Sequence, residues 1–299
     1  MATSGKDLSA YDKSEVPDGQ NMRIGIAVSR WNAEITEALY QGAYKTLLDC
    51  GVDAGHILRM DVPGSFELAF GCGKLIREEK PDAVIHFAAY IEVGESMTAP
   101  MPFFENNVTG SLNLIEAAVA AGCLRFVFSS TCATYGDQDN VVLDEDSAQH
   151  PINAYGASKR AIEDILANFD AAHNLQNVIF RYFNVAGADP EAEVGEFHQP
   201  ETHLVPLMIQ AIKGERAALT VFGTDYDTPD GTCIRDYIHV VDLADAHVRG
   251  VERLLAGGEG LTANLGSGRG NSVLEILDAC EAVTGKPLAR TIGPRRPGD

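Results

Sequence analysis

The chain has 299 residues, of which 45% are hydrophobic and 22% charged, a composition typical of a soluble globular protein with one large or two modest domains. Its formal net charge of −20 argues against nonspecific binding to nucleic acid or to an anionic membrane surface. No apolar run reaches the roughly 20 residues that a membrane-spanning helix needs, and the polar amino-terminal segment lacks the apolar core of a signal peptide. The 6 cysteines form no CxxC pair, and the 8 histidines form no HExxH motif. We therefore expect reduced thiols, no metal site and a cytoplasmic protein.

Apolar runs and amphipathic segments alternate along the first two thirds of the chain. The predicted strands are 23–29, 57–62, 83–88, 125–130 and 177–182, and the predicted helices are 32–50, 66–79, 106–121 and 154–172. This alternation predicts an α/β fold with a doubly wound parallel sheet. After Val185 a region rich in Pro, Gly and Asp, with helices predicted at 204–214 and 240–256, indicates a smaller lobe at the carboxyl edge of the sheet. The expected organisation is a flexible segment 1–21, a sheet domain 22–184 and a substrate lobe 185–299.

Two motifs cover the first predicted βαβαβ unit. They are RIGIAVSRWNAEITEAL, and then DVPGSFELAFGCGKLIREEKPDAVI. Together they resemble the first half of the lumazine synthase family, which implies a flavodoxin-like arrangement and a site for a heteroaromatic ring. By that resemblance the site residues are Trp31, Asn32, Ser65, Phe66 and Glu67. The family's phosphate-gripping loop is replaced by Glu92-Val93-Gly94-Glu95-Ser96, whose two carboxylates would repel a phosphate, so lumazine synthase activity is not expected.

Another set of motifs begins near His86. It comprises HFAAYIEVGES, FSSTCATYGD, NAYGASK, RYFNVAGA, GTCIRDYIHVVDLADAH and RRPGD. Tyr155 and Lys159 are four residues apart and share one helix face, and a lysine ammonium beside a phenol is expected to lower the phenol pKa. With the SST segment upstream and RYFN downstream, the chain resembles the extended short-chain dehydrogenase/reductases, and DGTCIRDYIHVVDL narrows this to the UDP-glucose (UDP-galactose) 4-epimerases. The resemblance runs to Asp299, where the family's last strand and helix are missing.

This second resemblance implies a Rossmann-like fold, NAD as cofactor, a UDP-sugar as substrate and interconversion of UDP-galactose and UDP-glucose through a 4-keto sugar. Tyr155 would take the proton of the sugar 4-hydroxyl, with Thr131 bonded to substrate and base, and Lys159 holding the nicotinamide ribose. The implied cofactor contacts are Phe87, Ala88, Asn106, Ser129, Tyr155, Lys159 and Tyr182. The implied UDP-sugar contacts are Asn184, His203, Phe222, Arg235, Arg296 and Asp299. A homodimer is compatible with the family, and no metal, membrane or nucleic-acid partner is implied.

The two resemblances join near residues 82–86. This segment is the third strand of one parent fold and the fourth of the other, and in both it pairs with the first strand, so we predict one continuous sheet. The turn after the first strand, Ser29-Arg30-Trp31-Asn32-Ala33, contains no glycine, whereas a dinucleotide-binding fold needs a glycine-rich turn at the pyrophosphate. Asp61 is the single candidate for an adenosine-ribose carboxylate. The segment Gly266–Gly270 is too compressed for a phosphate loop and is expected to be structural.

Three functions therefore stay open from the sequence. The first is an epimerase-derived hybrid impaired by the loss of the glycine-rich NAD loop. The second is an intact NAD-dependent UDP-hexose 4-epimerase that tolerates the exchanged half. The third is a non-catalytic α/β protein that keeps weak binding of nucleotide sugars or heteroaromatic rings, with a lumazine synthase-like enzyme as the alternative enzyme class.

Overall fold

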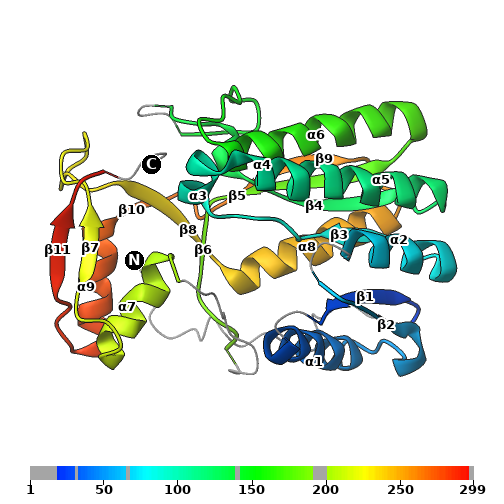
Figure 1. Ribbon diagram of the computed structural model, residues 1–299, viewed down its shortest axis with the longest axis horizontal. Coiled ribbons are helices and arrows are strands. Elements are labelled where there is room, and N and C mark those ends of the chain that lie inside the picture. Colours follow the sequence, from blue (N-terminus) through cyan, green and yellow to red (C-terminus); the bar gives the residue numbers. More distant parts are fainter. Residues whose placement is uncertain (1–18, 31–32, 65–67, 139–141, 191–200, 296–299) are drawn as a thin grey trace.

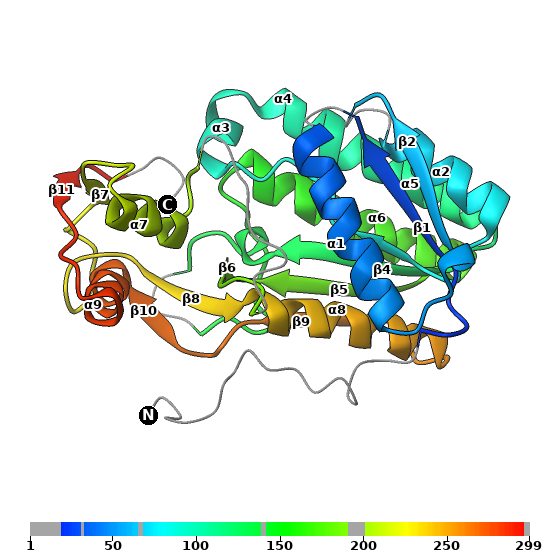
Figure 2. The same ribbon diagram turned by 90° about the horizontal axis from the view of Figure 1, so that it is seen from below.

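The structure is a computed structural model that describes residues 19–30, 33–64, 68–138, 142–190 and 201–295. A helix-covered sheet occupies one end of the elongated molecule, a smaller lobe occupies the other, and the first βα unit lies beside the sheet (Figures 1 and 2). This confirms the α/β, Rossmann-like class with parallel sheets. Within the described residues, no helix has the length and apolar character to cross a bilayer.

The main sheet has four parallel strands in the order β3-β4-β5-β9. Their bounds are β3 Val84–His86, β4 Arg125–Thr131, β5 Gln176–Tyr182 and β9 Leu261–Leu265. Successive side chains of β4 point to opposite faces, as the period of a strand requires. Phe126 and Phe128 pack in one core with Ile115 and Ile162, whereas Val127 packs in another with Leu254.

Helices cover both faces of this sheet. One layer contains α5 Gly110–Ala120 and α6 Ala154–His173, preceded by α3 Val93–Thr98, α4 Pro100–Phe103 and the π-helical turn η2 Phe104–Thr109. The opposite face is covered by α8 Val240–Leu255, which packs on β4 and β5. The short 3-10 turn η3 Cys132–Thr134 follows β4 directly. The central strands β4 and β5 are thus buried on both sides, as expected for parallel strands.

The first unit forms a sheet of its own. It contains β1 Ile24–Ser29, α1 Ala33–Asp49, η1 Ala54–His56, β2 Ile57–Val62 and α2 Leu68–Glu79, with β1 and β2 parallel. Helix α2 packs on both sheets: Leu75 lies over Gly25 of β1, where an added Cβ would be 3.3 Å from the leucine, and Ile76 joins the core under α5.

The predicted continuous sheet is wrong for the described residues, because β1 pairs with β2 and β3 pairs with β4, but β1 and β3 do not pair. With α2 wedged between β1 and α5, the two sheets are joined through side chains rather than through main-chain hydrogen bonds. Among the described residues no strand pairs with the side of β3 away from β4, and Ile85 and Phe87 are 42% and 58% exposed.

The lobe packs around a separate apolar core of Met208, Leu219, Val221, Leu277 and Leu288. Its elements are α7 Leu204–Lys213, β7 Leu219–Phe222, α9 Val273–Thr284 and β11 Arg290–Gly293, while β6 Asn184–Ala186, β8 Ile234–His239 and β10 Gly270–Ser272 form a three-stranded sheet. Helix α8 and strand β9 follow the expected boundary at residues 184 and 185 in sequence but lie in the main sheet layer, since β9 adds to β5 and α8 covers its face.

Candidate active site at the carboxyl ends of strands β4 and β5

Thr131 and Tyr155, which the sequence predicts to act together, are hydrogen-bonded through their side chains. Thr131 ends β4 and is also the N-cap of η3. Its hydroxyl accepts a hydrogen bond of 3.1 Å from the Ala133 amide in the first turn of η3. Helix α6 begins after Asn153, whose side chain caps the Gly156 amide at 2.8 Å. A side chain at Gly156 would collide with the Ala133 carbonyl, so the glycine lets the helix start press against η3. This contact places Tyr155 next to Thr131.

Lys159 lies one helical turn after Tyr155 and is 2% exposed. Its ammonium donates to the Ser129 carbonyl oxygen at 2.8 Å and lies 4.9 Å from the centre of the Phe128 ring. Burial lowers the pKa of Lys159 to about 7, and the Glu163 carboxylate opposes that shift. The lysine is therefore only partly protonated near neutral pH.

The pKa of Tyr155 differs from the sequence expectation. Burial raises it well above the ordinary phenol value, Tyr182 raises it further, and the hydrogen bond from Thr131 acts in the opposite direction. The expected lowering by Lys159 is wrong for this state of the protein, because the ammonium bonds to the Ser129 carbonyl and burial dominates the phenol. Tyr155 is accordingly a protonated phenol until a ligand changes the charge around it.

Four buried side chains hold the strands and the helix beneath this site. Glu163 of α6 forms an ion pair of 2.7 Å with Arg181 of β5 and accepts a hydrogen bond from the Ser130 hydroxyl of β4. Arg181 also donates to the Tyr135 hydroxyl at 2.9 Å. Each charge is paired, so the cost of burying it is offset and β4, β5 and α6 are held in one geometry.

Ser129 and Tyr182, both expected at the cofactor, are bonded to each other and to a residue that the sequence analysis did not single out. The Ser129 hydroxyl lies 2.7 Å from Nε2 of His247 on α8 and also bonds the Tyr182 hydroxyl. The ring of Phe87, another expected cofactor residue, lies 4.8 Å from the His247 ring. His247 is the last residue of the motif GTCIRDYIHVVDLADAH, and this motif was the sequence signal that could have identified it.

Asn107, rather than its neighbour Asn106, fixes the segment after β3. Its amide accepts from the Tyr90 amide at 2.8 Å and donates to the Tyr90 carbonyl and to the Ser158 hydroxyl, both at 3.0 Å. These bonds tie the β3 loop to α6 beside Lys159. The π-helical turn that carries Asn107 is a form often found at functional sites. Asn106 donates to Asn107 at 3.0 Å and turns toward a cavity.

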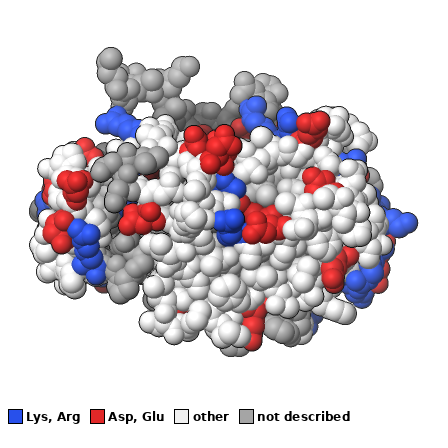
Figure 3. Space-filling model, turned by 90° about the horizontal axis from the view of Figure 1, so that it is seen from above, with Lys and Arg blue, Asp and Glu red and all other residues white. Residues whose placement is uncertain are grey.

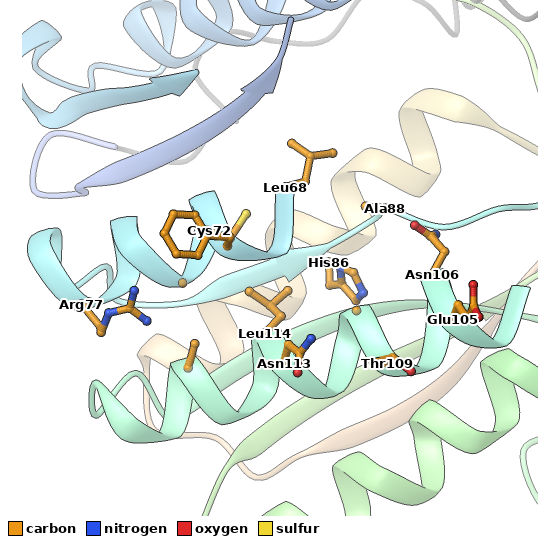
Figure 4. Close-up of a pocket in the computed structure, with 14 residues that line it drawn as sticks. Leu68, Cys72, Arg77, His86, Ala88, Glu105, Asn106, Thr109, Asn113 and Leu114 are labelled. Carbon is orange, nitrogen blue, oxygen red and sulfur yellow. The ribbon is translucent and has the colours of Figure 1, made fainter. Parts of the chain in front are cut away.

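That cavity has a volume of about 390 Å³ and lies between α2 and α5 beside the end of β3 (Figure 4). Ala88 and Asn106, both expected at the cofactor, line it, together with Phe70, Cys72 and His86. His86 stays neutral because burial lowers its pKa to about 3, with Lys159 adding to the shift, and its Nε2 lies 2.7 Å from the Ser111 hydroxyl. The cavity wall is thus largely apolar and uncharged at β3.

The expected UDP-sugar residues lie on four elements on the lobe side. Asn184 starts β6, His203 caps α7, Phe222 ends β7 and Arg235 lies in β8, which pairs with β6. His203 Nδ1 lies 3.0 Å from the Glu201 carboxylate, and Arg235 donates to the Ile234 carbonyl at 2.9 Å.

Two of the expected UDP-sugar residues, and the whole lumazine-type site, lie outside the described residues. They are Arg296 and Asp299, and Trp31, Asn32, Ser65, Phe66 and Glu67. Among the described residues, no group of three or more His, Cys, Asp or Glu could hold a metal ion.

The expected structural role of Gly266–Gly270 is confirmed, because the amides of Ser267 and Gly268 each donate to the Asp236 carboxylate at 2.8 Å. These amides are therefore used within the fold. Asp61 is likewise engaged, in an ion pair of 2.8 Å with Arg59. The second resemblance expects the nicotinamide end of NAD beside β4 and α6, whereas the first unit has an ion-paired carboxylate and a turn without glycine.

Residues 63–266 match the model of the NAD dependent epimerase/dehydratase family. Residues 21–99 match the model of 6,7-dimethyl-8-ribityllumazine synthase, so the two matches overlap on 63–99, which includes α2 and β3. The overlap is broader than the expected join at 82–86.

Relatives agree with the longer match. UDP-glucose 4-epimerase from Rhizobium leguminosarum bv. trifolii is 55% identical over 226 residues, which cover 76% of this chain and 69% of the relative. The crystal structure of UDP-glucose 4-epimerase from Brucella ovis in complex with NAD has a TM-score of 0.80 and 39% identity, and the alignment covers 92% of this chain and 87% of the other. The Bifidobacterium longum enzyme in complex with NAD+ and UDP has a TM-score of 0.76 and 37% identity, with coverage of 81% and 72%. The chain belongs to the NAD-dependent epimerase/dehydratase family.

Proposed function

We propose that this chain acts on UDP-hexoses as a UDP-glucose 4-epimerase, interconverting UDP-galactose and UDP-glucose through a 4-keto sugar. The observation that carries the proposal is the buried hydrogen-bonded pair Thr131 and Tyr155 with Lys159 on the same helix face. The names of the relatives support the substrate class, since those at 44–55% identity are UDP-glucose 4-epimerases. Bound NAD would accept the hydride of the sugar C4 and return it to the opposite face.

Tyr155 is the proposed base for the sugar 4-hydroxyl. Thr131 bonds the phenol oxygen and sets its direction at the end of β4. Because burial raises the phenol pKa, proton transfer needs a cation near the phenolate, and the ammonium form of Lys159 is the cation on the same helix face. Asn184, His203, Phe222, Arg235, Arg296 and Asp299 are proposed to hold the UDP-sugar.

We propose in addition that NAD is held weakly. Three observations support this: the turn 29–33 lacks glycine, Arg59 engages Asp61, and β1 does not pair with β3 in the described residues. Loss of two amide-to-phosphate bonds, at about 1.5–3 kcal/mol each, corresponds to roughly 100- to 10,000-fold weaker binding. Isothermal titration with NAD should therefore give an affinity weaker than micromolar, and a submicromolar dissociation constant would show that the exchanged unit anchors the cofactor after all.

A homodimer is proposed as the assembly. The face above α4, α5 and α6 carries small, separate groups of charged side chains between wide uncharged areas (Figure 3). Met101 of α4 is 62% exposed and adds an apolar side chain to this layer. Sedimentation equilibrium measures the mass directly, and a monomer at tens of micromolar would exclude the dimer.

The test of the activity is an assay with UDP-galactose, excess NAD and a coupled readout of UDP-glucose. Tyr155→Phe removes only the proton acceptor and should abolish turnover. Tyr44→Phe makes the same chemical change in α1, away from the site, and should leave the rate unchanged. Turnover that survives in Tyr155→Phe would reject Tyr155 as the base, and no turnover in the unaltered protein at saturating NAD would reject the activity.

A further inference from the structure

His247 of α8 is buried directly beneath the proposed nicotinamide end of the site. It is 2% exposed, and its ring lies 4.8 Å from the ring of Phe87 and 5.0 Å from that of Phe180. Nε2 lies 2.7 Å from the Ser129 hydroxyl of β4, and Nδ1 lies 2.8 Å from the Leu243 carbonyl oxygen, one turn earlier on α8. Both nitrogens therefore have a partner.

The Leu243 carbonyl decides the tautomer of this ring. A carbonyl oxygen only accepts, so Nδ1 carries a proton. Burial lowers the pKa of His247, opposed by the bond to Leu243, so the ring is neutral near pH 7 and Nε2 is an acceptor. The Ser129 hydroxyl must then donate its single proton to Nε2.

Tyr182 lies beside this pair. Its ring centre is 6.4 Å from that of His247, and its side chain interacts with the Ser129 hydroxyl. The carbonyl of the same Ser129 accepts from Lys159 at 2.8 Å. One serine thus connects His247 to Tyr182 through its side chain and to Lys159 through its backbone.

We infer that His247 is a positioning residue, which orients the Ser129 hydroxyl and through it the Tyr182 ring at the proposed cofactor site. It does not touch the reacting atoms. The competing explanation is that His247 only fills space among Phe87 and Phe180, as a leucine of similar volume would.

The two explanations differ in what Ser129→Ala does. If His247 acts through Ser129, removing either group breaks the same chain, so His247→Leu and Ser129→Ala should have equivalent and non-additive effects. If His247 only packs, the two effects should add, because the serine is not part of the packing. His247→Gln, which can present an acceptor oxygen near the position of Nε2, should recover most of the loss.

Nuclear magnetic resonance on the full chain with labelled histidine and tyrosine rings gives a readout that needs no turnover. We expect His247 to be neutral with the proton on Nδ1 near pH 7 and to titrate below the free-histidine value of about 6.5. We expect the Tyr182 ring signals to move alike in His247→Leu, Ser129→Ala and the double variant. A proton on Nε2, or unchanged Tyr182 signals in His247→Leu, would overturn the assignment.

Kinetics give a second readout, which rests on the proposed function. His247→Leu should lower kcat by roughly 10- to 100-fold, as expected for a misplacement of up to about 1 Å, while KM for UDP-galactose changes little. His173→Leu, the same substitution at an exposed histidine ending α6, is the matched control and should have no effect. A higher KM with unchanged kcat would contradict a role of His247 in orienting Ser129 and Tyr182 at the proposed cofactor site. Absent turnover in the unaltered protein would reject the proposed function, and the spectra would still decide the role of His247.

Discussion

Lys159 shows how this site uses a residue that is costly to bury. Its folded-state pKa is about 7 against an ordinary value of 10.5, so between these values the unfolded chain binds more protons than the folded one. The stability of the fold should therefore rise with pH between these two values. Below pH 7 the full free-energy cost of burying the Lys159 ammonium is present. Lys159→Met removes the penalty but leaves the Ser129 carbonyl without its donor.

We expect Lys159→Met to change the free energy of unfolding more favourably at pH 6 than at pH 10. The difference between the two pH values should be roughly 3–5 kcal/mol at most. Urea unfolding at the two pH values measures the difference, with Lys74→Met on the exposed side of α2 as the control. An equal effect of Lys159→Met at both pH values would show that the lysine titrates normally in the folded protein.

At the scale of single residues, the sequence predicted contacts that follow from local spacing, but it did not predict contacts between residues far apart in the chain. The spacing of Tyr155 and Lys159 placed both on one helix face, and the motifs brought Thr131 to them. His247 was missed because its partner Ser129 is 118 residues away in sequence, and no local pattern reports such a bond. The lowered phenol pKa was also wrong, since burial and the direction of the Lys159 ammonium are properties of the folded chain.

Strand β3 is the element for which the structure changes the expectation most. As a central strand it would bury Ile85, and Ile85→Asp would unfold the chain. With β1 paired elsewhere, Ile85 is 42% exposed, so a carboxylate there can stay hydrated. We now expect Ile85→Asp to cost about 1 kcal/mol or less.

The matched substitution in the same sheet is Val127→Asp on β4. Val127 is 0% exposed, packed beneath α8, and an unpaired charge there should cost more than about 4 kcal/mol or prevent folding. Thermal unfolding of both variants measures the contrast. A similar large loss in Ile85→Asp would mean that β3 is covered in solution, as the continuous sheet requires.

The elements themselves follow the sequence closely. Strand β2 has the predicted bounds, and α6 and β5 differ from theirs by one residue. Periodicity gives such bounds because each element carries its own apolar pattern. Periodicity does not show whether β1 pairs with β3, since both are apolar strands in either arrangement. It also does not show that α8 and β9 return to the main sheet after the first elements of the lobe.

For the whole molecule, we propose that the family's site is joined to a first unit that anchors NAD poorly. The two family matches overlap on α2 and β3, and α2 packs on both sheets, which explains how one chain accommodates both patterns. The proposed catalytic residues Thr131, Tyr155 and Lys159 lie beyond that overlap, within the part that matches the epimerase/dehydratase family model.

The most direct measurement is UDP-galactose turnover by the purified protein as a function of added NAD, together with the NAD released on denaturation. We expect little released NAD, no turnover without added cofactor, and a slow rate that rises with NAD beyond micromolar concentrations and disappears in Tyr155→Phe. Stoichiometric released NAD with full turnover in the absence of added cofactor would contradict this expectation.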